Sequence, residues 1–224
     1  MLEESRTLVR KMALGETLTY SDIKNFLLDL ANQVLQSRDE LNKMDAACGD
    51  GDFGTSMYVA FSNALKSIQS SQGEDIATLL SDYGNAILSS AGGAAGPIFG
   101  TLFAEAGKST KSRTELGVAE LATMFESSLR KIEARGGALV GDKTLLDVLD
   151  PVVGSLKKAA AEKVTLTSAL ADAAKAAQAG YEVSMRLAAR QGKARYLGAQ
   201  TVGQPDPGAY VTMLMLETLY RSVN

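Results

Sequence analysis

The chain contains no histidine, and this absence removes several classes of chemistry at once. Hydrolases that depend on an imidazole base, zinc sites with imidazole ligands and phosphohistidine intermediates all need this side chain. A metal site on this chain must therefore be built from carboxylates and other oxygen atoms. These are the ligands preferred by Mg²⁺, Ca²⁺ and Mn²⁺.

Cysteine and uninterrupted apolar runs are also scarce. The single cysteine, Cys48, excludes an internal disulfide and agrees with a reducing, cytoplasmic location. The most apolar stretch, 86–103, is interrupted by glycines and Pro97, so a buried helix is expected there and no membrane span. The first residues are acidic and no apolar run follows them, so no signal peptide is expected. A net charge of −3 argues against a partner such as nucleic acid.

The apolar residues follow a helical pattern almost throughout. In 21–41, for example, Ile23, Phe26 and Leu30 recur at three- and four-residue spacings, and Ser21 is expected to cap the helix. No useful stretch alternates with a period of two, so strands are not expected. The pattern predicts helices at 21–41, 56–70, 74–90, 97–107, 115–134, 144–163, 166–190 and 208–222.

Alanine is frequent on the buried faces of these helices, which favours close helix packing. We therefore predict an all-α bundle of about eight helices with connections of ordinary length. Without a low-complexity linker or an internal repeat, residues 1–224 are expected to form a single domain, with 1–19 as an N-terminal extension. Function in such a bundle is expected where the long polar loops meet. These loops are 44–55, 107–115, 135–143 and 191–207.

The sharpest local feature is a segment in which aspartates and glycines interleave. Asp45, Asp50 and Asp52 lie within eight residues, with glycines at 49, 51 and 54. Carboxylates crowded in this way repel one another unless a cation lies among them. Glycine lets a backbone approach a phosphate, and the helix expected to begin at Thr55 and Ser56 attracts an anion. The segment can thus supply metal ligands beside a phosphate site. The alternative is a solvated loop that caps a helix.

Three further motifs are ambiguous when each is read alone. The glycine-rich segment 91–101 suits either a close helix crossing or a backbone surface for an adenine or phosphates. In 141–147, Gly-Asp-Lys-Thr-Leu-Leu-Asp, either Asp142 or Thr144 fits a helix cap. The segment 192–208 is a basic loop followed by a proline-rich helix start.

Together and in this order, the four motifs resemble those of the L subunit of dihydroxyacetone kinases, also found as the C-terminal ATP domain of single-chain members. The family pattern runs D-x4-D-G-D-x-G, G-G-x-S-G-P-x-x-G-T, G-D-K-T-x-x-D, G-R-x-S-Y-L-G and D-P-G-A. The resemblance extends from about Tyr20 to the C-terminus. It implies an antiparallel barrel of about eight helices whose loops hold a nucleotide at one end.

The resemblance also implies roles for particular residues. Asp45, Asp50 and Asp52 would bind a pair of Mg²⁺ ions that bridge the phosphates of ADP or ATP. The other implied nucleotide contacts are Phe53, Gly54, Thr55 and Ser56 along the phosphates, Ala94, Ala95, Gly136 and Leu145 in the pocket wall, and Lys193, Asp206, Pro207 and Gly208 closing over it.

Five positions depart from the family pattern. Phe53 stands where bacterial L subunits commonly have histidine, and Ala95 replaces a serine whose hydroxyl would face phosphate. Lys193 replaces arginine, which keeps the charge and loses the bidentate fork. Arg195 replaces a small residue, and Gln200 stands where arginine is frequent. None of these changes touches the three aspartates, so the metal site is expected to be retained.

The resemblance implies a phosphotransferase subunit that works with another protein. The acceptor, dihydroxyacetone or a related short ketose, is expected on a histidine of a separate DhaK-type K subunit, a role that a histidine-free chain cannot play. The nucleotide would either exchange, ADP for ATP, or stay bound as ADP while a DhaM-type phosphotransferase-system protein rephosphorylates it. Two alternatives stay open: a non-catalytic, nucleotide-bound regulatory module, and a kinase domain for a different carrier-presented substrate.

Overall fold

The computed structural model describes residues 17–71, 73–90, 95–111 and 113–223. These residues are mainly helical, as predicted. The helices are α2 (Tyr20–Gln36), α3 (Arg38–Ala46), α4 (Phe53–Gln69), α5 (Ile76–Leu88), α6 (Ala95–Ser109), α7 (Val118–Gly136), α8 (Leu146–Glu162), α9 (Leu166–Met185) and α10 (Pro207–Arg221). Two short 3-10 helices, η1 (Lys193–Tyr196) and η2 (Gly198–Thr201), and two strands, β1 (Leu18–Thr19) and β2 (Glu115–Leu116), complete the set.

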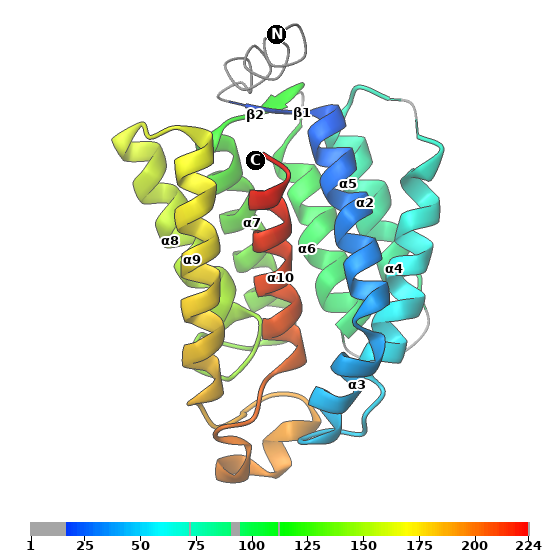
Figure 1. Ribbon diagram of the computed structural model, residues 1–224, viewed down its shortest axis with the longest axis vertical. Coiled ribbons are helices and arrows are strands. Elements are labelled where there is room, and N and C mark those ends of the chain that lie inside the picture. The colour runs from blue at the N-terminus through cyan, green and yellow to red at the C-terminus, as the bar shows by residue number, and fades with distance from the viewer. Residues whose placement is uncertain (1–16, 72, 91–94, 112, 224) are drawn as a thin grey trace, which may run out of the picture.

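The long helices form a closed ring. Apart from the short α3, each helix packs against the next one along the chain, and α10 returns to pack against α2. The eight helices α2 and α4 to α10 therefore surround one apolar core (Figure 1). Neighbouring helices of the ring run in opposite directions (Figure 1). The predicted antiparallel barrel of about eight helices is confirmed.

Capping side chains fix several helix ends. The Thr19 hydroxyl accepts a hydrogen bond from the Asp22 amide (3.3 Å), and the Asp22 carboxylate accepts one from the Thr19 amide (2.9 Å). This capping box starts α2 at Tyr20, so the prediction of Ser21 as the cap was wrong. The caps of α5, α9 and α10 are Asp75, Thr165 and Asp206.

Three local predictions need correction. The helix expected at 21–41 divides at Ser37, whose non-helical backbone separates α2 from the polar helix α3. The helix expected at 166–190 ends at Met185, and a separate segment follows it. Strands were not expected, yet β1 and β2 form an antiparallel pair with Leu18 opposite Leu116. Two residues per strand are too few to produce an alternating pattern.

The interior is filled by side chains. Aromatic rings of α4, α5 and α6 meet edge to face, with Tyr83 against Phe61 and Phe103. Glycines let α5 and α6 approach closely, because a side chain at Gly84 or Gly100 would collide with the backbone of the opposite helix. A cavity between α2, α5, α6, α7 and α10 measures only about 10 Å³, roughly the space of one water molecule.

The alternating helix directions bring several connections to one end of the barrel. Those that matter for the site are residues 47–52 between α3 and α4, 137–145 between α7 and α8, and 186–206 between α9 and α10 (lower part of Figure 1). The strand pair lies at the opposite end. No helix in the part of the chain that the structure describes has both the length and the apolar character needed to cross a membrane.

Candidate functional site

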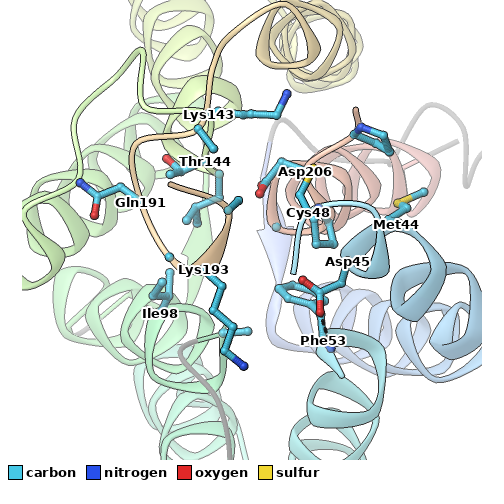
Figure 2. Close-up of a pocket in the computed structure, with 18 of the residues that line it drawn as sticks. Met44, Asp45, Cys48, Phe53, Ile98, Lys143, Thr144, Gln191, Lys193 and Asp206 are labelled. Atoms are coloured by element: carbon cyan, nitrogen blue, oxygen red, sulfur yellow. Dashed lines mark hydrogen bonds between the residues drawn. The ribbon is translucent and has the colours of Figure 1, made fainter. Parts of the chain in front are cut away.

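A pocket of about 230 Å³ lies where these connections meet (Figure 2). Its walls come from the α3–α4 connection, the starts of α4, α6 and α10, residues 143–145 and the α9–α10 connection. Many residues predicted from the family resemblance lie in these walls. They are Asp45, Asp50, Asp52, Phe53, Ser56, Ala95, Leu145, Lys193, Asp206, Pro207 and Gly208.

Of the predicted site residues that the structure describes, three are not in the pocket wall. Gly54 and Thr55 lie in the first turn of α4 behind the wall, where Thr55 is bonded to Asn42 of α3 through both its amide and its hydroxyl (3.0 Å each). Gly136 is exposed at the last turn of α7. Ala94 lies outside the described residues.

The three aspartates converge on one point. One carboxylate oxygen from each of Asp45, Asp50 and Asp52 lies within 4.8 Å of the other two. Asp45, near the end of α3, also organises the loop, because its Oδ2 accepts hydrogen bonds from the amides of Gly51 (2.8 Å), Asp52 (3.1 Å) and Phe53 (3.4 Å). These bonds fold the loop back over Asp45 and hold the carboxylates together.

The glycines of this loop have a steric cause. A side chain at Gly49 would collide with the Asp45 carboxylate, so the loop can pass close to Asp45 only with glycine there. Gly51 has a φ of +75°, in the left-handed region that glycine adopts without strain. The interleaving of aspartate and glycine is therefore what lets the loop fold around one carboxylate.

The first turn of α4 borders the carboxylate cluster. The helix begins at Phe53 with Asp52 as its N-cap, three residues before the predicted start at Ser56. Its first turn contains no acidic side chain, and Phe53 and Ser56 face the pocket. Because a helix N-terminus attracts negative charge, this wall can hold an anion directly beside a cation bound by the aspartates.

Lys193 reaches the cluster from the other side of the pocket. Its ammonium group donates a hydrogen bond to the Asp50 carboxylate. This bond lowers the pKa of Asp50 and raises the pKa of Lys193. Both side chains are well exposed, so the ion pair itself contributes little to stability. Its importance is positional, because it brings a positive charge to the mouth of the pocket.

A second pair of charged residues, Lys143 and Asp206, lies deeper in the wall. Asp206 caps α10 by accepting from the Ala209 amide (2.7 Å). Burial raises the pKa of Asp206 to about 6, against the opposing effects of that amide and the Lys143 charge. Lys143 is only 4% exposed, and burial lowers its pKa. Its ammonium donates to the carbonyl oxygens of Ser184 (3.0 Å) and Met185 (3.3 Å).

Several pocket residues were not predicted. Lys143 and Thr144 belong to the third motif, which marked the segment without giving either residue a role in the site. Ile98 and Phe99 of α6 repeat the spacing of core residues, so their pattern does not distinguish a pocket wall from the barrel interior. The remaining residues in this group are Met44, Cys48, Ala189, Gln191, Gly192, Ala194 and Pro205.

An acidic cluster, a helix N-terminus, a lysine and an apolar wall thus meet at one end of a closed helical barrel. This arrangement defines a class of helical domains suited to a divalent cation together with a phosphorylated ligand. The chain belongs to the DAK2 domain family, which matches residues 47–221.

Relatives of similar length share nearly the whole chain. It is 34% identical to the ADP-binding subunit DhaL of the PEP-dependent dihydroxyacetone kinase of Escherichia coli (strain K12), over 91% of this chain and 97% of that protein. It is 27% identical to the ADP-binding subunit DhaL of the PTS-dependent dihydroxyacetone kinase of Lactococcus lactis, over 92% and 99%. Human triokinase/FMN cyclase is 30% identical over 85% of this chain, which spans 33% of that protein.

A solved structure shares the fold. The dihydroxyacetone kinase from C. freundii in complex with AMP-PNP and Mg²⁺ matches with a TM-score of 0.68 and 25% identity. The match covers 92% of this chain and 34% of that kinase chain. The family predicted from the four motifs is therefore confirmed, and so is its helical fold.

Proposed function

We propose that this chain is the ADP- or ATP-binding subunit of a dihydroxyacetone-type kinase. It would take part in transfer of a phosphoryl group to dihydroxyacetone, or to a related short ketose, held on a separate K subunit. The observation that supports this most strongly is the convergence of Asp45, Asp50 and Asp52 beside the first turn of α4. Relatives of nearly equal length are described as ADP-binding subunits. On this proposal the chain is one nucleotide-binding domain with residues 1–19 as an extension.

The donor atoms of the cluster fit Mg²⁺. This ion prefers hard oxygen ligands, and each aspartate offers one carboxylate oxygen to a common point. In the proposal, Asp45, Asp50 and Asp52 hold a pair of Mg²⁺ ions, as implied by the family resemblance. When bound, Mg²⁺ would neutralise charge on the nucleotide phosphates.

The remaining residues would position the nucleotide. The amides at the start of α4 attract the phosphates, Lys193 supplies a positive charge, and apolar side chains such as Ile98 and Leu145 form a wall for the base. Phosphoryl transfer depends mainly on such positioning and charge neutralisation, and needs no nucleophile from this chain. Lysine at 193 gives a point charge where arginine would give a two-pronged contact.

The missing histidine makes the proposed enzyme depend on partners. A histidine that holds the ketose must come from another protein, a DhaK-type subunit. The near-full-length relatives are described as PEP- or PTS-dependent. We therefore favour an ADP that stays bound and is rephosphorylated by a DhaM-type phosphotransferase-system protein, in the cytoplasm.

Calorimetric titration of ADP and ATP, with and without Mg²⁺, tests the binding site. The wild-type chain is expected to bind in a Mg²⁺-dependent way. Asp50→Ala and Asp52→Ala should each weaken binding by roughly 100-fold or more, because each removes a charged ligand from a shared metal site. Circular dichroism should show unchanged helicity. Asp172→Ala, at an exposed aspartate on α9, is the matched control and should bind as the wild type does.

Three results would contradict the proposal in different ways. Unchanged affinity in both site variants would mean that the aspartates do not hold the metal. Failure of the wild-type chain to bind millimolar nucleotide would remove the nucleotide role. If binding is normal but adding a K-type subunit and a phosphoryl donor gives no turnover, the regulatory-module alternative takes first place.

A further inference from the structure

The connection between α9 and α10, residues 186–206, forms one side of the pocket, and we call it the lid segment. It contains η1 and η2 and carries Lys193 to the aspartate cluster. Much of its surface is exposed, and Tyr196 is 78% exposed. A bond from the Ala189 amide to the buried Thr201 hydroxyl (2.7 Å) holds it internally, and its position also depends on how its two ends are held.

Both ends of the lid segment are fastened close to residues 142–143. At the start, the Arg190 amide donates to the Asp142 carbonyl oxygen, and the Gln191 side chain donates to the Asp142 carboxylate (3.1 Å each). At the end, the Gly203 amide donates to the Met185 carbonyl oxygen (2.7 Å). That carbonyl also accepts from the Lys143 ammonium group (3.3 Å). Lys143 therefore shares a bond acceptor with the far end of the lid segment.

The backbone at Lys143 is unusual for a lysine. Its φ is +62°, in the left-handed region that favours glycine. Among the described residues other than glycine, only Lys163 also has a positive φ, and that lysine is exposed at the end of α8. Lys143 is buried, so its strained backbone is offset by what its side chain does inside the protein.

The Lys143 side chain holds the end of α9. Its ammonium binds the carbonyl oxygens of Ser184 and Met185, in the last turn of the helix, where the helix dipole favours positive charge. Asp206, the cap of α10, attracts the same ammonium. Figure 2 shows Lys143 and Lys193 pointing away from each other, so Lys143 does not face the aspartate cluster.

We propose that Lys143 is a positioning residue that fixes the lid segment for nucleotide binding, by joining the end of α9 to the wall that contains Asp206. Its role in binding rests on the function proposed above. The lid segment presents Lys193, Ala194 and Pro205 to the pocket, so loosening its ends weakens nucleotide binding by displacing these residues.

Hydrogen exchange of the nucleotide-free protein tests the structural part of this proposal. Lys143→Met keeps the aliphatic stem and removes the ammonium, so the amides of Arg190 and Gly203 should exchange about tenfold faster or more, as expected when bonds from a charged donor are lost. Lys163→Met, at the other left-handed lysine, should leave both amides unchanged. Equal exchange in Lys143→Met and wild type would overturn the proposal.

Titration of Mg–ADP tests the functional part. Lys143→Met is expected to weaken binding about tenfold, and Lys143→Arg to restore much of it, because a cation again reaches the α9 carbonyl groups. Lys143→Gly distinguishes the effect of the left-handed backbone from that of the ammonium group. Glycine relaxes the backbone and removes the ammonium, so nucleotide binding should weaken even if the melting temperature rises. Wild-type affinity in Lys143→Gly would overturn the proposal.

These measurements separate the two proposals. If the wild-type chain binds no nucleotide, the function proposed above fails, and the exchange experiment still decides whether Lys143 holds the lid segment. If Lys143→Met is too unstable to study, Lys143→Arg and Lys143→Gly decide between the cation and the backbone conformation. If nucleotide affinity simply rises and falls with melting temperature across these variants, Lys143 has only a structural role. That result would overturn the positioning role.

Discussion

At the scale of single residues, the three aspartates of the cluster do different work. Asp50 forms an exposed ion pair with Lys193, and Asp52 stands at the N-cap of α4 without capping it through its side chain. The Asp45 carboxylate accepts hydrogen bonds from three backbone amides and so stabilises the conformation of the loop. The same residue type at three nearby positions is therefore expected to respond differently to substitution.

Asp45→Ala should reduce stability as well as binding. The amides of Gly51, Asp52 and Phe53 would lose their acceptor, at a cost of about 1–3 kcal/mol. Asp52→Ala should lose Mg²⁺-dependent nucleotide binding while its free energy of unfolding stays within about 0.5 kcal/mol of the wild type. Urea denaturation of the nucleotide-free variants measures the difference. Equal stability of the two variants would show that the Asp45 bonds do not hold the loop.

The raised pKa of Asp206 should make the free energy of unfolding depend on pH. Its pKa in the folded protein, about 6, lies above the ordinary value of 3.8, so the folded state keeps this proton over a range in which the unfolded chain releases it. The contribution of this group to stability is therefore fully present below pH 4 and is lost as the pH rises to about 6. Lowering the pH from 7 to 5 should stabilise wild type over Asp206→Asn by about 1 kcal/mol, because water near the pocket weakens the full effect of the pKa shift.

Asn at 206 is a suitable comparison because asparagine also caps helices well and does not titrate. Denaturation curves of both proteins at pH 5, 6 and 7 give the difference directly. Groups whose pKa values are the same in both proteins contribute equally to both curves, so their titration cancels in the difference. A difference that stays constant over this range would mean that Asp206 is ionised with an ordinary pKa.

At the scale of elements, the helices were predictable and their ends less so. Residues 186–189 continue the apolar pattern of α9, so the sequence predicts a helix to 190, yet α9 ends at Met185. The Lys143 ammonium and the Gly203 amide, both distant in sequence, bind the Met185 carbonyl oxygen in place of further helical bonds. No local pattern reveals such contacts. The break at Ser37 involves a single residue and each strand only two. Neither is long enough to produce a recognisable pattern in the sequence.

Close packing of α5 against α6 gives an element-scale prediction. A methyl group at Gly84 would collide with the backbone of Ala104 in α6, so Gly84→Ala should destabilise the fold by about 1–3 kcal/mol. Gly154→Ala is the control, because a methyl group there meets nothing within 4 Å on the exposed side of α8. This control should stabilise the protein by up to about 1 kcal/mol, since alanine favours a helix more than glycine does.

Urea denaturation of the two glycine variants provides the measurement. Opposite signs for the two changes in unfolding free energy are expected. If Gly84→Ala were neutral, α5 and α6 would have to move apart freely, and the close crossing would not contribute to the stability of the barrel.

At the scale of the whole molecule, the barrel and the site were predicted by different kinds of reasoning. Helical periodicity predicted a bundle, and the antiparallel barrel came from the family resemblance, whereas the packing of α10 against α2 that closes the ring is seen only in the structure. The motifs also brought together the aspartates, Leu145 and Lys193, which line one pocket. Gly136 is not in that pocket, and Lys143 received no role, because a motif shows which segment matters without showing where each side chain points.

The position of the pocket predicts how nucleotide binding affects the whole barrel. Its walls come from α3 and α4 near the start of the chain, from α6 and residues 143–145, and from the lid segment and α10 near the end. A ligand held by all of these segments binds only the closed barrel, so it should raise the stability of the complete ring.

Mg–ADP at about 100 times its dissociation constant should add about 2.7 kcal/mol to the free energy of unfolding, or roughly 5–10 °C to the melting temperature. Calorimetry should show a single unfolding transition whose melting temperature rises with Mg–ADP. ADP with EDTA should leave the melting temperature unchanged. Two separate transitions, with only one shifted by Mg–ADP, would mean that the two halves of the ring unfold independently and that the nucleotide is held by one of them alone.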